Sequence, residues 1–189
     1  MSSPAAITQA PRVTWTYEDY RLMPDDGQRY EVIKGKLFVT PAPSTTHQRV
    51  SKRIQLALML QIEERGLGQV YNAPVDLIFS NTTTVQPDLL VVRKEREAFI
   101  TERGIETAPD IVIEIVSDST RSSDRKRKFK LYAERGVREY WIVDPHERTF
   151  ELFVPGDTQY ELHARFGPGD EVRSSVFAVT LQVDRVFRP

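Results

Sequence analysis

The sequence predicts an α/β fold of the mixed α+β kind, with a central mixed β-sheet flanked by helices. Three observations lead to this prediction. Short apolar runs bounded by turn residues recur along the chain, and two of them, residues 85–92 and 111–117, each contain one carboxylate. Apolar residues recur at helical spacing over residues 50–62. A strongly basic helix follows the second acid-bearing run, so helices and strands alternate as in a layered domain.

Caps and apolar spacing predict the first two helices. Thr16 can cap a short helix over residues 17–22, which ends before a proline. Ser44 or Thr45 can cap a much longer helix that ends near Gly66. The apolar residues of this long helix lie on one side, so that side is expected to pack on a core.

The remaining apolar runs are predicted to be strands. Lys34-Gly35 is a short turn that makes the first two strands a hairpin, and Pro155-Gly156-Asp157 joins the last two. Residues 181–187 fit either a strand or a helix. In chain order the predicted strands cover residues 30–33, 36–39, 69–71, 75–79, 85–92, 111–116, 139–144, 148–154 and 159–164.

Composition limits the class of protein. The 189 residues suit one domain, predicted at residues 15–189 after a flexible N-terminal tail of residues 1–14. The formal net charge of −1 argues against a protein that coats nucleic acid indiscriminately, but not against a local basic groove. The absence of cysteine excludes disulfides and thiolate sites and fits a cytoplasmic protein. No apolar run is long enough to span a membrane, and the tail has no apolar core of a signal peptide.

The two acids inside apolar strands are the strongest functional signal. Asp88 shares a strand face with Gln86 and Leu90, and Glu114 lies on the next predicted strand. If their strands pair, both carboxylates can point into one pocket, where Mg²⁺ or Mn²⁺ would find the oxygen ligands that it prefers. Such an ion can polarise a phosphoryl oxygen and acidify a bound water. The alternative is structural, because a buried acid is more often paired with a cation than catalytic.

The helix predicted over residues 119–135 is the second unusual element. Asp124, Lys128 and Tyr132 recur every four residues and therefore share one face. Lys128 could point at the carboxylates and orient water or neutralise a phosphate, while its neighbours hold a phosphate backbone. The alternative is a solvated basic face with an Asp124–Lys128 pair. Residues 121–130 of this helix carry six cations, which are Arg121, Arg125, Lys126, Arg127, Lys128 and Lys130.

At these residues the chain resembles the Uma2 family, which belongs to the PD-(D/E)xK superfamily of restriction-endonuclease-like nucleases. The resemblance covers roughly residues 16–187 and is most specific in the run from Gly136 to Pro145, Gly-Val-Arg-Glu-Tyr-Trp-Ile-Val-Asp-Pro. It also includes Gln86-Pro87-Asp88, residues 109–117 and residues 30–37.

The resemblance implies a four-stranded mixed core sheet flanked by helices, with extra β-hairpins. It implies that Asp88 and Glu114 bind the metal, with the main-chain carbonyl of Ile115 as a further ligand. The superfamily lysine would fall two residues after Glu114, where this chain has valine, and Lys128 looks like its migrated substitute. The resemblance also implies accessory positions around the site, which are Glu31, His47, Gln86, Asp124 and Tyr132.

The leading functional prediction is an endonuclease that hydrolyses DNA with Mg²⁺ or Mn²⁺ as cofactor. Asp88, Glu114 and Lys128 would be its catalytic residues, and Arg121, Arg125, Lys126 and Arg127 would contact the phosphate backbone. A homodimer is attractive because cutting both strands of a duplex usually takes two active sites. The rival prediction is a catalytically inactive nuclease-like module that binds nucleic acid or serves assembly.

Overall fold

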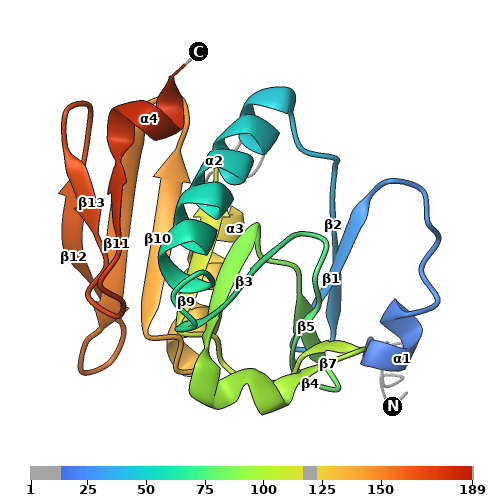
Figure 1. Cartoon of the computed structure of the whole chain (residues 1–189). Coiled ribbons are helices and arrows are strands. Elements are labelled where there is room, and N and C mark those ends of the chain that lie inside the picture. Colours follow the sequence, from blue (N-terminus) through green and yellow to red (C-terminus); the bar gives the residue numbers. More distant parts are fainter. Residues whose placement is uncertain (1–13, 117–122, 189) are drawn as a thin grey trace, which may run out of the picture.

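The computed structural model describes residues 14–116 and 123–188. Its centre is a mixed β-sheet that runs through the middle of the molecule (Figure 1). In the described residues this sheet has six strands, and the four-stranded core that the resemblance implies is extended by the β11–β12 hairpin. In hydrogen-bonded order the strands are β12 (Tyr160–Phe166), β11 (Thr149–Pro155), β10 (Glu139–Asp144), β9 (Ile111–Ile115), β6 (Leu89–Arg93) and β3 (Gly68–Asn72).

The strands β6 and β9 pair directly, which is the condition under which the sequence allowed a shared pocket for Asp88 and Glu114. β6 runs antiparallel to β9, with Leu89 opposite Ile113, whereas β9 runs parallel to β10. Asp88 immediately precedes β6, and Glu114 immediately follows Ile113. The two acids therefore reach the same end of the same strand pair.

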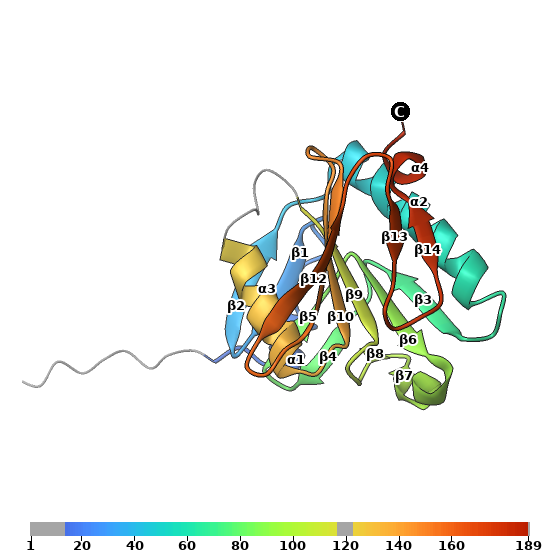
Figure 2. The ribbon, with the colours of Figure 1, turned by 90° about the vertical axis from the view of Figure 1, so that its left-hand side faces the viewer.

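Different elements cover the two faces of the central sheet (Figure 2). One face carries α2 (Thr45–Ile62), α4 (Val183–Phe187) and the ribbon of β13 (Glu171–Arg173) and β14 (Thr180–Gln182). The other face carries α3 (Ser123–Glu134). α2 packs through Val50, Ile54, Leu58 and Ile62, whose helical spacing predicted this face. Burying each such side chain contributes roughly 1.5–3 kcal/mol.

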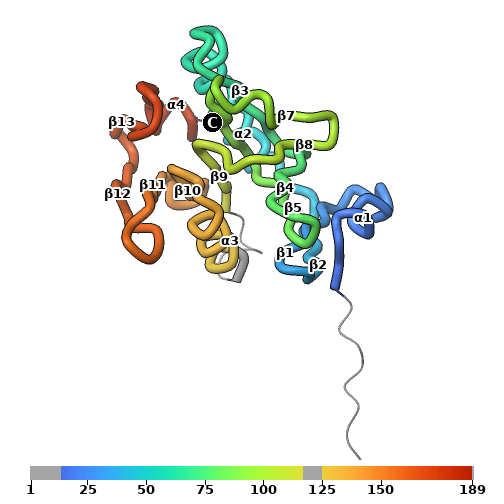
Figure 3. The backbone as a smooth tube through the Cα atoms, turned by 90° about the horizontal axis from the view of Figure 1, so that it is seen from below, coloured from blue at the N-terminus to red at the C-terminus, as the bar shows by residue number. Residues whose placement is uncertain are grey.

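A second sheet lies on the α3 side of the molecule, and the sequence did not predict it. In the order of the chain, α3 and β10 come between the strands of this sheet and the hairpin β11–β12, as the colours of Figure 3 show. Its β1–β2 turn has Lys34 and Gly35 at positive φ, as a tight hairpin requires. In hydrogen-bonded order its strands are β2 (Lys36–Thr40), β1 (Arg29–Ile33), β5 (Thr83–Val85), β4 (Leu77–Ser80), β8 (Gly104–Ile105) and β7 (Ile100–Thr101).

The single strand predicted over residues 85–92 is wrong, because the structure divides it into β5 and β6. The break falls at Gln86-Pro87-Asp88, where Pro87 has no N–H for a ladder and the Gln86 N–H donates instead to Glu31 Oε1. Asp88 thus lies in the turn before β6 and not inside a strand. The face assignment still holds downstream, since Leu90, Val92 and Val112 pack in one cluster with Tyr132.

The other differences concern ends and short elements. The first helix, α1 (Tyr17–Tyr20), has the predicted Thr16 cap but is shorter than expected, and α2 ends at Ile62 rather than near Gly66. The ambiguous C-terminal segment forms both β14 and α4. The 3₁₀-helix η1 (Lys94–Phe99) was not predicted.

Two expectations lie outside the described residues. The predicted flexible tail lies there except for Thr14, and so do the helix caps expected between Ser117 and Thr120. In the part of the chain that the structure describes, no helix has the length and apolar character needed to cross a membrane.

Candidate active site

Asp88 is the centre of a buried network of hydrogen bonds. Its Oδ1 accepts from Arg29 Nη1 of β1 at 2.9 Å. Its Oδ2 accepts from the main-chain N–H of Ile115 at 2.8 Å and lies 2.9 Å from Nε2 of His47, on the first turn of α2. Four segments distant in sequence, namely β1, α2, the turn before β6 and the end of β9, therefore meet at one carboxylate.

Glu114 is the centre of a second, adjacent network. Lys128 Nζ lies 3.0 Å from Glu114 Oε1 and also 3.0 Å from Glu31 Oε1. The hydroxyl of Tyr132, one turn further along α3, donates to Glu114 Oε1 at 2.7 Å. The sequence predicted that Lys128 and Tyr132 share a helix face, and in the structure both side chains on that face contact Glu114.

One small cavity of about 180 Å³ connects the two networks. The side chains of Asp88, Glu31, Lys128, His47 and Glu114 are 6%, 4%, 7%, 9% and 13% exposed, so all five are largely shielded from solvent. Its walls are formed by Arg29, Glu31, Thr40, Pro41, Ala42, Pro43, Ser44, His47, Gln86, Asp88, Glu114, Ile115 and Lys128.

A larger, open groove of about 1070 Å³ adjoins the cavity. The two share Arg29, Ala42, Pro43, His47, Gln86 and Asp88, so the groove leads to the first network. Its other walls come from α1, the segment between α1 and β1, the exposed side of α2 and the segment around Asp76. A bound polymer could therefore lie in the groove while one of its linkages enters the cavity.

Asp88 is strongly acidic in this environment. Burial alone would raise the pKa of Asp88, but the hydrogen bond and charge of His47, the charge of Arg29 and the Ile115 N–H together lower it to about 2. Tyr132 shifts in the opposite direction, because burial and the neighbouring Glu114 raise its pKa well above the ordinary value. Asp88 is therefore an ionised acceptor at neutral pH, while Tyr132 remains a protonated donor.

The predicted accessory residues take different places. Glu31 and His47 belong to the two networks described above. Gln86 contributes through its main chain, whereas its side-chain amide donates away from Asp88, to Tyr20 and Asp76. Asp124 lies on α3, but its side chain is outside the described residues.

Of the cations predicted to contact phosphates, the three that the structure describes do not line the small cavity. Arg125 pairs with Glu151 of β11, and the Arg127 guanidinium lies 3.7 Å from the centre of the Phe38 ring. Lys126 is exposed and lines a separate hollow between α3 and the β11–β12 turn. Arg121 lies outside the described residues.

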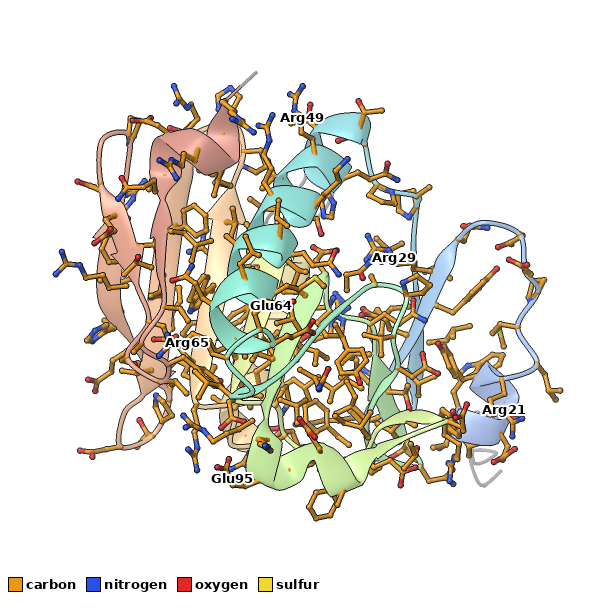
Figure 4. The ribbon with its side chains drawn as sticks, viewed as in Figure 1. Arg21, Arg29, Arg49, Glu64, Arg65 and Glu95 are labelled. Atoms are coloured by element: carbon orange, nitrogen blue, oxygen red, sulfur yellow. The ribbon has the colours of Figure 1, made fainter. Side chains whose placement is uncertain are left out.

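Arg29 is the site residue that the sequence analysis missed. Its side chain is 19% exposed, and Figure 4 shows it between the ribbons of β1 and α2. Burial alone would lower its pKa, but the charges of Asp88, Glu114 and Glu31 raise it. The predicted strand began at Tyr30 and so left Arg29 out, whereas β1 begins at Arg29 and places it on the same face as Glu31, two positions on.

The donors present suit a hard divalent cation. Asp88, Glu114 and Glu31 supply carboxylate oxygens around one cavity, which is the ligand chemistry of Mg²⁺ and Mn²⁺. Among the described residues no three histidine, aspartate or glutamate side chains gather as a complete metal-binding group. Mg²⁺ commonly needs only one or two protein carboxylates, because waters and substrate phosphate complete its coordination.

The mixed central sheet with helices on both faces has a restriction-endonuclease-like fold, and Asp88, Glu114 and Lys128 meet at a cavity beside it. The sequence model of Uma2, described as "Putative restriction endonuclease", matches residues 17–185. The chain therefore belongs to the Uma2 family.

Individual relatives agree with this assignment of family and fold. A crystal structure described as a "putative nuclease belonging to DUF820" from Anabaena variabilis superposes with a TM-score of 0.76 at 21% identity. The match covers 91% of this chain and 97% of that one, and it shows the fold. The uncharacterized protein slr1290 of Synechocystis sp. is 24% identical, covering 85% of this chain and 84% of its own. The uncharacterized protein sll1609, from the same organism, is 23% identical, and the match covers 80% of this chain and 87% of that protein.

Proposed function

We propose that this protein is an endonuclease that hydrolyses phosphodiester bonds in DNA with Mg²⁺ or Mn²⁺. The observation that carries the proposal is the meeting of Asp88, Glu114 and Lys128 at one buried cavity, although they come from three separate segments. Membership in a nuclease family supports the reaction class. The identity of the metal, the preference for DNA and the roles of individual residues are parts of the proposal.

In this proposal Asp88 and Glu114 hold the metal, together with the main-chain carbonyl of Ile115. The Ile115 N–H already donates to Asp88. Since the N–H and C=O of one residue in a strand point to the same side, the Ile115 carbonyl is expected to face the same cavity. When bound, the ion would polarise the phosphoryl oxygen and lower the pKa of a water.

Lys128 would neutralise charge at the scissile phosphate or orient the attacking water. It is suited to this because its ammonium is held between two carboxylates, Glu31 and Glu114, at the cavity wall. A fixed cation in a water-poor site stabilises developing negative charge more strongly than one in bulk water. Tyr132 would keep Glu114 in place by donating to it.

Arg121, Arg125, Lys126 and Arg127 remain proposed contacts to the phosphate backbone outside the cavity. Arg125 and Lys126 are exposed on α3. Their contribution would be electrostatic and would weaken as salt concentration rises. The target sequence is left open by contacts of this kind, because phosphates carry no sequence information.

The test is cleavage of supercoiled plasmid and of short single-stranded DNA in Mg²⁺, Mn²⁺ or EDTA. Asp88→Ala and the isosteric Asp88→Asn should abolish metal-dependent cutting, and Lys128→Ala should reduce it by orders of magnitude. Glu64→Ala and Lys94→Ala are matched controls, because both side chains are exposed and lie outside the cavity and the groove. Full activity in a folded Asp88→Ala protein would refute the assignment.

A binding or assembly module without catalysis is the second candidate. The observation that favours it is that both Asp88 oxygens already accept hydrogen bonds from protein groups, as a purely structural carboxylate would. Metal titration separates the two candidates. An enzyme predicts that Mn²⁺ raises the melting temperature of the wild-type protein but not of Asp88→Asn, because a ligand stabilises only the state that binds it.

A homodimer is also part of the proposal, because two active sites can cut the two strands of a duplex in one encounter. Sizing chromatography with light scattering, with and without duplex DNA, tests it. A mass of one chain under both conditions would overturn the dimer and leave the nuclease proposal intact.

A further inference from the structure

We propose that Arg29 binds the scissile phosphate. When the metal binds, the Arg29 guanidinium would leave its ion pair with Asp88 and form a new one with the phosphate. This inference rests on the proposed nuclease function and adds a substrate-binding residue to it. Two observations support the proposal. Arg29 forms an ion pair with Asp88, and the Arg29 side chain lies where the groove meets the cavity.

The contact with Asp88 is close enough to conflict with a metal ion. Arg29 Nη1 lies 2.9 Å from Asp88 Oδ1, while Oδ2 is held by His47 and by the Ile115 N–H. Oδ1 is therefore the oxygen left for a metal. A divalent cation there would stand within a few ångströms of the guanidinium, and two such charges repel strongly in a site of low dielectric constant.

The total charge of the cavity explains why Arg29 should stay in the site. With His47 counted as neutral, the three carboxylates Glu31, Asp88 and Glu114 face two cations, Arg29 and Lys128, so these described groups carry a net charge of −1. A divalent cation brings this to +1, and one phosphodiester then brings it to zero. A buried site tolerates a neutral assembly far better than an excess charge.

The chemistry of the side chain fits the new partner. A guanidinium matches the spacing of two phosphate oxygens and can bind them in a bidentate manner. Arg29 lines both the open groove and the small cavity, so a modest rotation can carry its guanidinium from Asp88 to a linkage entering from the groove. The charge of the guanidinium is permanent, so the exchange requires no proton transfer.

Two measurements on Arg29→Gln test the exchange. Calorimetric titration of the metal-free protein with Mn²⁺ should show about tenfold tighter binding than in the wild type, because the competing cation is gone. Affinity for a fluorescent DNA oligonucleotide should be compared in EDTA and in Ca²⁺, with the oligonucleotide shown by gel to be intact. In the wild type Ca²⁺ should tighten oligonucleotide binding, and in Arg29→Gln this gain should shrink by about tenfold.

Controls distinguish this role from a structural one. Arg148→Gln removes an exposed arginine that pairs with Asp184 away from the site, and it should change neither quantity. Arg29→Lys keeps the charge without the bidentate fork, so its loss of Ca²⁺-dependent oligonucleotide binding should be intermediate. This variant also serves if Arg29→Gln fails to fold, as judged by its melting curve.

The outcomes separate this inference from the nuclease proposal. Weaker Mn²⁺ binding in Arg29→Gln, with an unchanged gain in oligonucleotide affinity, would show that Arg29 merely holds Asp88 and would overturn the exchange alone. Failure of the wild type to bind any divalent cation would overturn both proposals.

Discussion

Lys128 lies within 3.0 Å of Glu114, fourteen positions earlier in the sequence, and the two side chains form the link between α3 and the central sheet. Glu114 lies on β9, whose neighbours β6 and β10 fix its position from both sides. The same lysine reaches Glu31 of the second sheet at 3.0 Å. One buried ammonium thus joins three layers of the molecule at the proposed active site.

The ion pair of the buried Lys128 with Glu31 predicts that mutations of these two residues have non-additive effects on stability. Lys128→Met should lower the free energy of unfolding by about 3 kcal/mol, because it leaves two buried carboxylates without their cation. Adding Glu31→Gln should restore part of the loss, so the double mutant should be more stable than the sum of the single changes indicates. Urea denaturation measures all three, with Lys94→Met as the exposed control. Strict additivity would show that the two side chains do not interact in solution.

The Tyr132 hydroxyl predicts an effect on metal binding that packing alone would not produce. Tyr132→Phe keeps the ring against Phe79 and Tyr140 but removes the donor to Glu114 Oε1. We expect a loss of about 1–2 kcal/mol in stability and a several-fold loss in Mn²⁺ affinity, because Glu114 is then less well oriented. Tyr160→Phe is the matched control, since its hydroxyl donates to the Val137 carbonyl away from the cavity. Equal Mn²⁺ affinities in the two variants would contradict the role given to Tyr132.

The low pKa of Asp88 predicts an acid-dependent loss of stability. Its pKa falls from 3.8 to about 2 on folding, so the ionised carboxylate stabilises the folded state above pH 4. This contribution is lost as the pH falls through 2, and it amounts to about 2 kcal/mol. The difference in unfolding free energy between wild type and Asp88→Asn should therefore shrink by that amount between pH 4.5 and pH 2. Parallel curves over this range would contradict the shift, because the other carboxylates titrate in both proteins.

The local signals of the sequence predicted the central sheet well. β10 matches its predicted bounds, and the four buried apolar residues of α2 match the predicted face. The second sheet escaped prediction because several of its strands are only two or three residues long, too short for alternation to show. The division of residues 85–92 also depends on a tertiary contact, the hydrogen bond from the Gln86 N–H to Glu31, which no local pattern contains.

The candidate site was predictable where spacing along one element sets the geometry. The four-residue interval of Lys128 and Tyr132 is visible in the sequence, and the structure brings both to Glu114. The hydrogen bonds of Asp88 with Arg29 and His47 were not predictable, because they join residues 59 and 41 positions apart through the packing of separate elements. An acid in an apolar strand is also ambiguous by itself, since Asp110 and Glu139 are fully buried acids outside the cavity.

Glu139 provides a test of that ambiguity. Its two oxygens accept from Trp141 Nε1, from the Ser174 hydroxyl, and from both the N–H and the hydroxyl of Ser175, so it ties the segment before β14 to β10. Glu139→Gln should cost about 2–3 kcal/mol, because an amide cannot accept from all of these donors and leaves buried groups unpaired.

Metal binding by this variant should be unchanged, because Glu139 lies outside the cavity that Asp88 and Glu114 share. Urea denaturation and Mn²⁺ titration of the same preparation provide both measurements. Asp88→Asn should show the reverse pattern in the titration, with Mn²⁺ binding lost in a folded protein. If Glu139→Gln instead folded normally and lost Mn²⁺ binding, the metal site would have to be placed at the other end of the sheet, beside β10.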